Sequence, residues 1–213
     1  MDKKLIVRYA MLIIGVSIMS LGIALSIKAT LGTPPISCIP YVLSIAFPLT
    51  VGEFTILFNA LLVLFQMFLL KKVTLSQIAQ MLVCFLFGYM IDFNLLVIDF
   101  INPADYLSQW ILCIISCFVL AFGLVIEVKS DITMLPGDGA VVAIGEVLNK
   151  DWGKVKPFFD ITIVSIGVIL ALSLLGHLEG VREGTVFSAI TIGFIIQFYN
   201  NVFGYRIDDY LEK

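Results

Sequence analysis

Five acidic residues lie in or beside the most apolar segments of the second half of the chain. They are Glu127, Asp131, Asp138, Glu146 and Asp160. The positions 101 residues earlier hold only neutral residues, namely Ser26, Thr30, Ser37, Ile45 and Asn59. Carboxylates inside long apolar segments are costly and commonly mark ion, proton or substrate sites. The set therefore predicts a site for a cation or a proton in the second half of the chain.

Several of these acids also have a purely structural interpretation. Asp138 follows Pro136-Gly137 and precedes an apolar helical run, so it is either a helix N-cap or a ligand. Asp160 is close to two lysines and is either an interfacial acid or part of a site. Glu127 and Asp131 flank Lys129, so a solvated ion-pair cluster competes with a ligand site. Lys28 and Lys129 could neutralise acids or hold an anion beside helix N-termini.

Polar residues in other apolar segments extend the candidate set. Asp92 and Gln197 each follow a glycine by four residues inside an apolar run, and leaving either side chain against lipid would be costly. We therefore expect both to face the bundle interior. The candidate binding residues are Asp138, Asp160, Asn59, Ser37, Thr33, Asp92, Gln197, Glu127 and Asp131.

Composition sets the class of protein. Hydrophobic residues make up 60% of the chain, charged residues 14%, and the mean hydropathy is +1.06, which indicates an integral membrane protein embedded in the lipid bilayer. The net charge of −3, with no clustered basic face, predicts no nucleic-acid partner. The four cysteines show no CxxC spacing, and no HExxH, GxSxG or Walker sequence occurs. We accordingly expect no enzyme activity, no metal site and no cofactor.

The apolar runs predict the elements. Six are long enough to span a bilayer: residues 6–27, 54–70, 75–98, 110–128, 158–175 and 185–203. Two runs, 36–47 and 139–148, are too short to span and follow the breaks Thr33-Pro34-Pro35 and Pro136-Gly137. Irregular backbone at membrane depth is tolerated only where protein buries it or it lines a polar cavity. The breaks therefore predict two re-entrant elements beside a polar cavity.

The two halves of the chain resemble one another. At an offset of 101 residues the identical pairs are Gly22/Gly123, Lys28/Lys129, Pro35/Pro136 and Gly52/Gly153. At an offset of 105 they are Gly88/Gly193, Ile91/Ile196 and Phe93/Phe198. The sequence thus predicts two repeats, residues 1–101 and 102–213, each with three spanning helices and one re-entrant helix. Three crossings per unit make the second unit run opposite to the first, so the predicted fold is an all-α inverted repeat.

The distribution of Lys and Arg predicts the orientation. With six crossings and the N-terminus inside, only Lys28 and Arg182 lie outside. With eight crossings the split would fall to eight inside against five outside, counted over the same 13 residues. The positive-inside rule favours six crossings with both termini in the cytoplasm, and eight crossings remain the rival topology.

Two stretches resemble the YczE/YyaS/YitT family of bacterial integral membrane proteins. Residues 22–35, GIALSIKATLGTPP, are similar to that family's exit from the first helix. The stretch Arg182-Glu183-Gly184-Thr185 is similar to its entry into the last helix. The resemblance covers nearly the whole chain and implies a multi-pass protein of the bacterial cell membrane. It implies no substrate.

These observations favour a secondary transporter for a small molecule or ion, coupled to protons or selective for a cation or zwitterion. Two alternatives stay open. In the first, the protein is a substrate-binding membrane subunit that works with a separate ATPase. In the second, it is a membrane scaffold or regulator that transports nothing. A closed, dry interior would indicate the scaffold. The sequence leaves a homo-oligomer open and names neither the solute nor the coupling ion.

Overall fold

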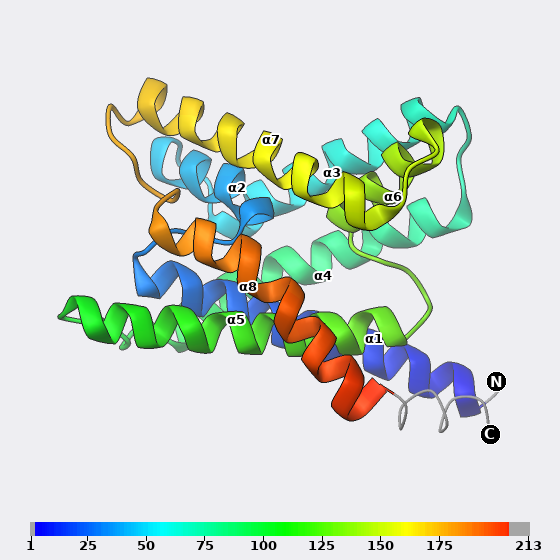
Figure 1. The fold of residues 1–213 in the computed structure, drawn as a ribbon, viewed down its shortest axis with the longest axis horizontal. Coiled ribbons are helices and arrows are strands. Elements are labelled where there is room, and N and C mark those ends of the chain that lie inside the picture. Colours follow the sequence, from blue (N-terminus) through cyan, green and yellow to red (C-terminus); the bar gives the residue numbers. More distant parts are fainter. Residues whose placement is uncertain (1–2, 205–213) are drawn as a thin grey trace.

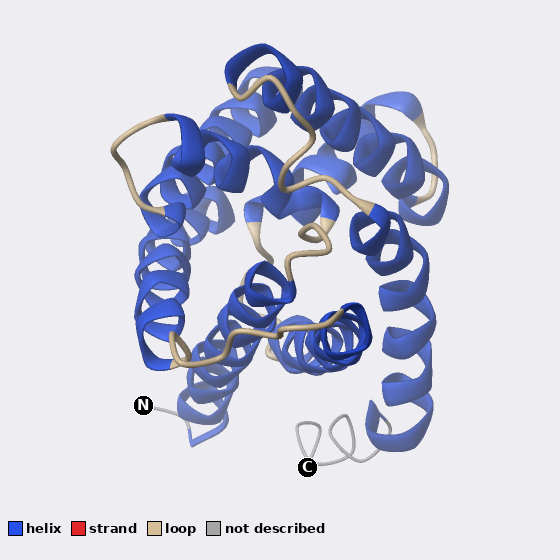
Figure 2. Cartoon of the chain, turned by 90° about the vertical axis from the view of Figure 1, so that its left-hand side faces the viewer, coloured by secondary structure: helices blue, strands red, loops and turns tan. Residues whose placement is uncertain are grey.

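A computed structural model describes residues 3–204 of the chain, and these residues form helices and connecting loops (Figures 1 and 2). The helices are α1 Lys3–Ala29, α2 Pro35–Ala46, α3 Val51–Leu70, α4 Leu75–Val97, α5 Tyr106–Lys129, α6 Pro136–Leu148, α7 Trp152–Leu174 and α8 Glu183–Tyr199, which continues into the π-helix Asn200–Gly204. Residues 1–2 and 205–213 lie outside the described part of the chain.

Six of these helices are long and apolar enough to cross a membrane. Helices α2 and α6, at 12 and 13 residues, are shorter. A rise of about 1.5 Å per residue makes each of them roughly 18–20 Å long, less than the ~30 Å hydrocarbon core. The all-α architecture with six spanning helices and two short ones is therefore confirmed, and the protein is a multi-pass membrane protein.

Helix starts follow from the local sequence. Thr50 caps α3 and Thr74 caps α4, each in a capping box with the residue three positions on, Glu53 and Gln77. Helices α2 and α6 begin instead on a proline at the first helical position, where the missing N–H costs no hydrogen bond.

The backbone leaves the helix in the same way before both short helices. After α1, Thr30 has φ 58°, and after α5, Asp131 has φ 52°, so each enters the left-handed region. These two positions are 101 residues apart. The two breaks therefore share a backbone conformation as well as a proline.

The centre of the fold is the contact between α1 and α5, which lie side by side (Figure 1). A methyl group on Gly22 would lie 2.7 Å from the Leu120 nitrogen, and one on Gly123 would lie 2.6 Å from the Met19 nitrogen. Glycine at both positions lets the two backbones approach closely, as in membrane helix pairs with small residues at the interface.

Ion pairs mark the two ends of α1. Near its start, Arg8 contacts Asp131, which follows α5, at 2.7 Å. Near its end, Lys28 contacts Asp99, which follows α4, at 2.6 Å. Helix α1 therefore begins on the membrane side where α5 ends, and it ends on the side where α4 ends.

Several other helix contacts of one half have an equivalent contact in the other half. Helix α2 packs on α7 while α6 packs on α3, and α1 packs on α4 while α5 packs on α8. Equivalent contacts of this kind are expected for an inverted repeat. One relation is unequal, because α3 packs closely on α4 and no comparable packing joins α7 to α8 within residues 3–204. The repeat and its division into 1–101 and 102–213 stay predictions.

Candidate functional site

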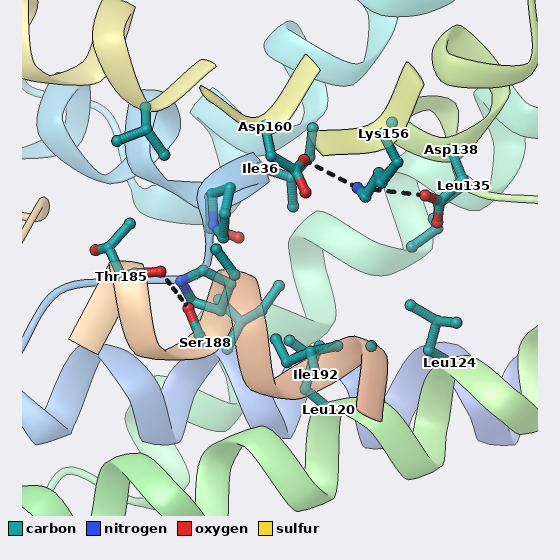
Figure 3. Close-up of a pocket in the computed structure, with 18 of the residues that line it drawn as sticks. Ile36, Leu120, Leu124, Leu135, Asp138, Lys156, Asp160, Thr185, Ser188 and Ile192 are labelled. Atoms are coloured by element: carbon teal, nitrogen blue, oxygen red, sulfur yellow. Dashed lines mark hydrogen bonds and ion pairs between the residues drawn. The ribbon is translucent and has the colours of Figure 1, made fainter. Parts of the chain in front are cut away.

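A cavity of about 590 Å³ lies between the two helix breaks. Helices α1 to α8 all contribute to its wall, so segments far apart in the sequence meet there (Figure 3). The wall is mostly apolar, with residues such as Ile23, Phe87, Leu120 and Ile192. The sequence predicted a polar cavity, and that was wrong for most of the wall because the spanning helices turn apolar side chains inward as well as outward.

The two breaks touch one another in the cavity wall. Pro35 and Ser37 at the start of α2 line it, as do Gly137 and Asp138 at the start of α6. A methyl group on Gly137 would lie 2.9 Å from the side chain of Ile36, so only glycine fits there without a shift. The predicted meeting of the breaks beside a cavity is therefore present in the structure.

Three charged side chains form the polar part of the wall. The Lys156 ammonium lies 3.4 Å from an oxygen of Asp138 and 3.0 Å from an oxygen of Asp160 (Figure 3). The exposed fractions of the side chains are 26% for Lys156, 20% for Asp138 and 15% for Asp160. We call Asp138, Lys156 and Asp160 the charged triad. It joins α6 to α7, because Asp138 is on the first helix and the other two residues are on the second.

The charged triad decides between the two interpretations of Asp138. The residue at the N-cap of α6 is Leu135, and no side chain caps that helix end. Asp138 lies in the first turn, where the helix dipole favours a carboxylate, and its oxygen faces Lys156. The capping interpretation was therefore wrong, because Pro136 moves the helix start two residues ahead of Asp138.

Ser37 and Asn59 also line the cavity, whereas Thr33 does not. Both Ser37 and Asn59 are buried, at 4% and 5% exposure. Thr33 is buried and is held by the loop before α8, because its N–H donates a hydrogen bond to the carbonyl of Gly180 at 3.0 Å. It lines a second, smaller cavity of about 250 Å³.

Asp92 and Gln197 occupy different environments. Asp92 is half-buried and accepts hydrogen bonds from the Thr50 hydroxyl at 2.6 Å and the Gly52 N–H at 2.8 Å, so it holds α4 to the start of α3. Gln197 is exposed on α8 and lies outside the cavity wall. The expectation that Gln197 faces the bundle interior was wrong, because α7 does not pack on this part of α8.

Glu127 and Asp131 do not form one cluster, in contrast to the expected ion-pair group around Lys129. Glu127 is 1% exposed, and its carboxylate accepts a hydrogen bond from the Leu135 N–H at 2.9 Å. It thereby fixes the backbone of the second break. Asp131 is exposed and pairs with Arg8. Neither carboxylate lines the cavity, since α5 turns Glu127 toward the break and the left-handed turn sends Asp131 outward.

Lys156 is the residue that the sequence argument missed. It was noted only as one of two lysines near Asp160 and as a charge of the inner membrane side, and was not named as a site residue. Its position four residues before Asp160 on one helix was the available signal, since side chains at that spacing share a face. Its second partner, Asp138, is 18 positions earlier and depends on how α6 meets α7. Among residues 3–204, no group of three His, Cys, Asp or Glu side chains is arranged to hold a metal ion.

Comparison with known proteins finds relatives of this chain, one of which is named a membrane protein. The chain is 26% identical over 201 residues to the "Uncharacterized membrane protein YczE" of Bacillus subtilis, covering 93% of this chain and 87% of that protein. It is 27% identical to the "Uncharacterized protein YyaS" of the same organism, over 76% of this chain and 79% of the relative. An uncharacterized protein of Haemophilus influenzae is 23% identical, over 91% and 83%. No solved structure matches the chain.

The resemblance to YczE and YyaS seen in the sequence is thus confirmed, and the YitT part of it stays a prediction. Residues 6–201 match the profile of a family described as "Family of unknown function (DUF6198)". That match spans almost every helix around the cavity, including all three members of the charged triad. The chain therefore belongs to the DUF6198 family.

Proposed function

We propose that the protein is a secondary transporter for a small solute that carries one positive charge. The observation behind this proposal is the 590 Å³ cavity with an apolar wall and a shielded charged triad between two broken helices. Cavities of roughly 300–1,000 Å³ with mostly apolar walls and a few polar groups are typical of small-molecule sites. Solute sites in transporters built from repeats commonly lie at such broken helices.

The charge of the solute follows from the triad. Two carboxylates face one ammonium group, so the ionised triad carries one net negative charge. An oxygen of Asp160 is buried and has no hydrogen bond, although it lies 3.0 Å from the Lys156 nitrogen. It can therefore accept a further donor. An ammonium group or a proton that binds there would neutralise the site at a depth where net charge is costly.

The cavity also helps to compare transport with the two alternative functions, a scaffold and an ATPase-dependent subunit. A scaffold would be expected to have a closed, dry interior, whereas this interior holds a cavity with charged groups in its wall. A substrate-binding subunit that needs an ATPase would bind the same solute and would fail to move it alone. We propose binding and transport, with no enzyme activity, and assign the bacterial cell membrane as the location with both termini in the cytoplasm.

Purified protein in liposomes would test the proposal. Organic monocations and zwitterions of several sizes would be screened for uptake with and without a pH gradient. We expect uptake of at least one of them, and a reduction of tenfold or more in Asp160→Asn, which removes the charge at nearly constant shape. Asp131→Asn is the matched control, because that carboxylate is 80% exposed and lies outside the cavity wall.

Two results would contradict the proposal. Equal loss of uptake in Asp160→Asn and Asp131→Asn would show that the triad has no special role. Binding without uptake, measured as thermal stabilisation by the same solutes, would favour the ATPase-dependent subunit instead. A saturating solute at 100 times its dissociation constant stabilises a protein by about 2.7 kcal/mol, which is readily measured.

A further inference from the structure

The start of α3 meets α4 at a pair of glycines. A methyl group on Gly88 would lie 2.5 Å from the carbonyl oxygen of Gly52, and one on Gly52 would collide with the carbonyl oxygen of Gly88. Asp92, one helical turn after Gly88, accepts hydrogen bonds from the Gly52 N–H and from the hydroxyl of Thr50, the N-cap of α3. Backbone contact and hydrogen bonds together close this edge of the bundle.

The second half of the chain has two glycines at the equivalent positions, but these two glycines do not contact each other. Gly153 and Gly193 stand 101 and 105 residues after Gly52 and Gly88. Both line the cavity, and a methyl group added to either would meet no atom within 4 Å. The helix register is also the same, because Asp151 is the N-cap of α7 and Gly153 is its second helical residue.

The polar partners match as well, with the roles of donor and acceptor exchanged. Asp151 stands where α3 has Thr50, and Gln197 stands where α4 has Asp92. In the closed pair a hydroxyl donates to a carboxylate. In the open pair an amide N–H₂ could donate to a carboxylate, while the amide oxygen accepts from the Gly153 N–H. Asp151 and Gln197 are both exposed, and the Asp151 side chain does not cap its helix.

We infer that these two glycine pairs are the gates of the cavity and that they close alternately. The α3–α4 gate consists of Thr50, Gly52, Gly88 and Asp92, and it is closed in this structure. The α7–α8 gate consists of Asp151, Gly153, Gly193 and Gln197, and it is open. In the exchanged state Gly153 lies against Gly193, Gln197 binds Asp151 and the Gly153 N–H, and the α3–α4 gate is separated.

The packing of the short helices permits this exchange. Helix α2 packs on α7 and α6 packs on α3, so each short helix packs on a long helix of the other half as well as on the long helix that follows it. The two gates lie toward opposite membrane sides. Asp92 lies on the half of α4 that leads to Asp99, which pairs with Lys28 near the end of α1. Gln197 lies on the half of α8 that leads to Gly204. A methyl group added to Gly204 would lie 3.7 Å from Lys129, the last residue of α5. Alternate closure would thus expose the cavity to one side at a time. This inference rests on the proposed transport function.

Disulfide trapping in membrane vesicles tests the gates without any solute. Thr50→Cys/Asp92→Cys probes the closed gate, since those side chains touch at 2.6 Å. Asp151→Cys/Gln197→Cys probes the open gate at the matching positions. The four native cysteines are buried, so copper phenanthroline should act on the introduced pairs. Trapping is irreversible, so even a minor closed state of the α7–α8 gate accumulates product with time.

We expect both pairs to form disulfides, the first one faster. Adding Gly193→Leu should slow the Asp151→Cys/Gln197→Cys disulfide at least tenfold, because the leucine blocks closure, and should leave the Thr50→Cys/Asp92→Cys disulfide unchanged. Phe194→Leu is the matched control, placing the same leucine on an exposed position one residue further along.

Two outcomes would overturn the inference. One is no disulfide in the α7–α8 gate after the α3–α4 pair has reacted to completion. The other is a disulfide that forms equally fast with Gly193→Leu, which would mean that the helices approach without glycine contact. If both disulfides form as expected in a protein that shows no uptake, the inference about the gates stands and the proposed transport function is rejected. The two proposals can therefore fail separately.

Discussion

Replacing Lys156 with methionine should destabilise the protein by an amount that the structure allows us to bound. The substitution keeps most of the side-chain volume and removes the charge between Asp138 and Asp160. The two carboxylate oxygens lie 3.4 and 3.0 Å from the same nitrogen, so they are at most about 6.4 Å apart. At an effective dielectric constant of about 20, two unit charges at ~6.4 Å repel by about 2.6 kcal/mol.

The loss of stability in Lys156→Met should exceed the repulsion energy between the two carboxylates. Removing one partner of a shielded ion pair also leaves the other uncompensated, and measured costs are about 3–5 kcal/mol for buried pairs. The triad is partly exposed to the cavity, so we expect about 3 kcal/mol. For a chain of this size that corresponds to a fall in Tm of roughly 6–12 °C. Thermal unfolding in detergent micelles, followed by tryptophan fluorescence, would measure it.

Two variants make the measurement specific. Lys156→Met/Asp160→Asn removes one of the two facing charges and should recover at least half of the loss. Lys72→Met breaks the exposed pair with Glu146, whose side chains are 53% and 56% exposed, and should cost less than about 1 kcal/mol. If Lys156→Met is no more destabilising than Lys72→Met, the triad is solvated like a surface pair and the argument for a charged solute fails.

Three further outcomes follow from the structure. Glu127→Ala should cost about 3 kcal/mol because it removes the acceptor for a buried backbone N–H, and Glu127→Gln, which keeps an acceptor, should cost less than half of that in the same unfolding assay. Gly52→Ala should destabilise by about 1–3 kcal/mol through overpacking, whereas Gly153→Ala should be neutral or slightly stabilising, and a reversed order would contradict the assignment of open and closed gates. The hydrogen bond to Glu179 raises the pKa of His177 above its usual value, so the stabilisation it provides is complete below the unfolded pKa and is lost as pH rises through the folded pKa. An NMR titration should show that raised pKa returning toward normal in Glu179→Gln.

The number of helices could be predicted because the signals are local. Long apolar runs give the spanning helices, and Pro35 and Pro136 interrupt them at matching places. Bounds were less accurate, since the first helix was expected over 6–27 and α1 is Lys3–Ala29. The difference arises because hydropathy marks the lipid-facing part of a helix, while hydrogen bonds continue past it into the polar ends.

The details of the site could be predicted only in part. The breaks, Asp138 and Asp160 were found, because charge inside an apolar segment is visible in the sequence. The partner of Asp138 was not, since the 3.4 Å contact to Lys156 depends on the angle at which α6 meets α7. The burial of Glu127 was missed for the same reason, because its partner is the backbone N–H of Leu135, which carries no side-chain signal.

The charged triad and the gates are linked by the way the helices pack. Asp138 belongs to α6, which packs on α3, whereas Lys156 and Asp160 belong to α7, which carries α2. The Lys156–Asp160 pair is within one helix, but the Lys156–Asp138 pair connects the two packing units. A cation bound at the Asp160 oxygen that has no hydrogen bond would therefore lie beside the ion pair that connects the two packing units. The proposed solute site and the connection between the units thus share Lys156.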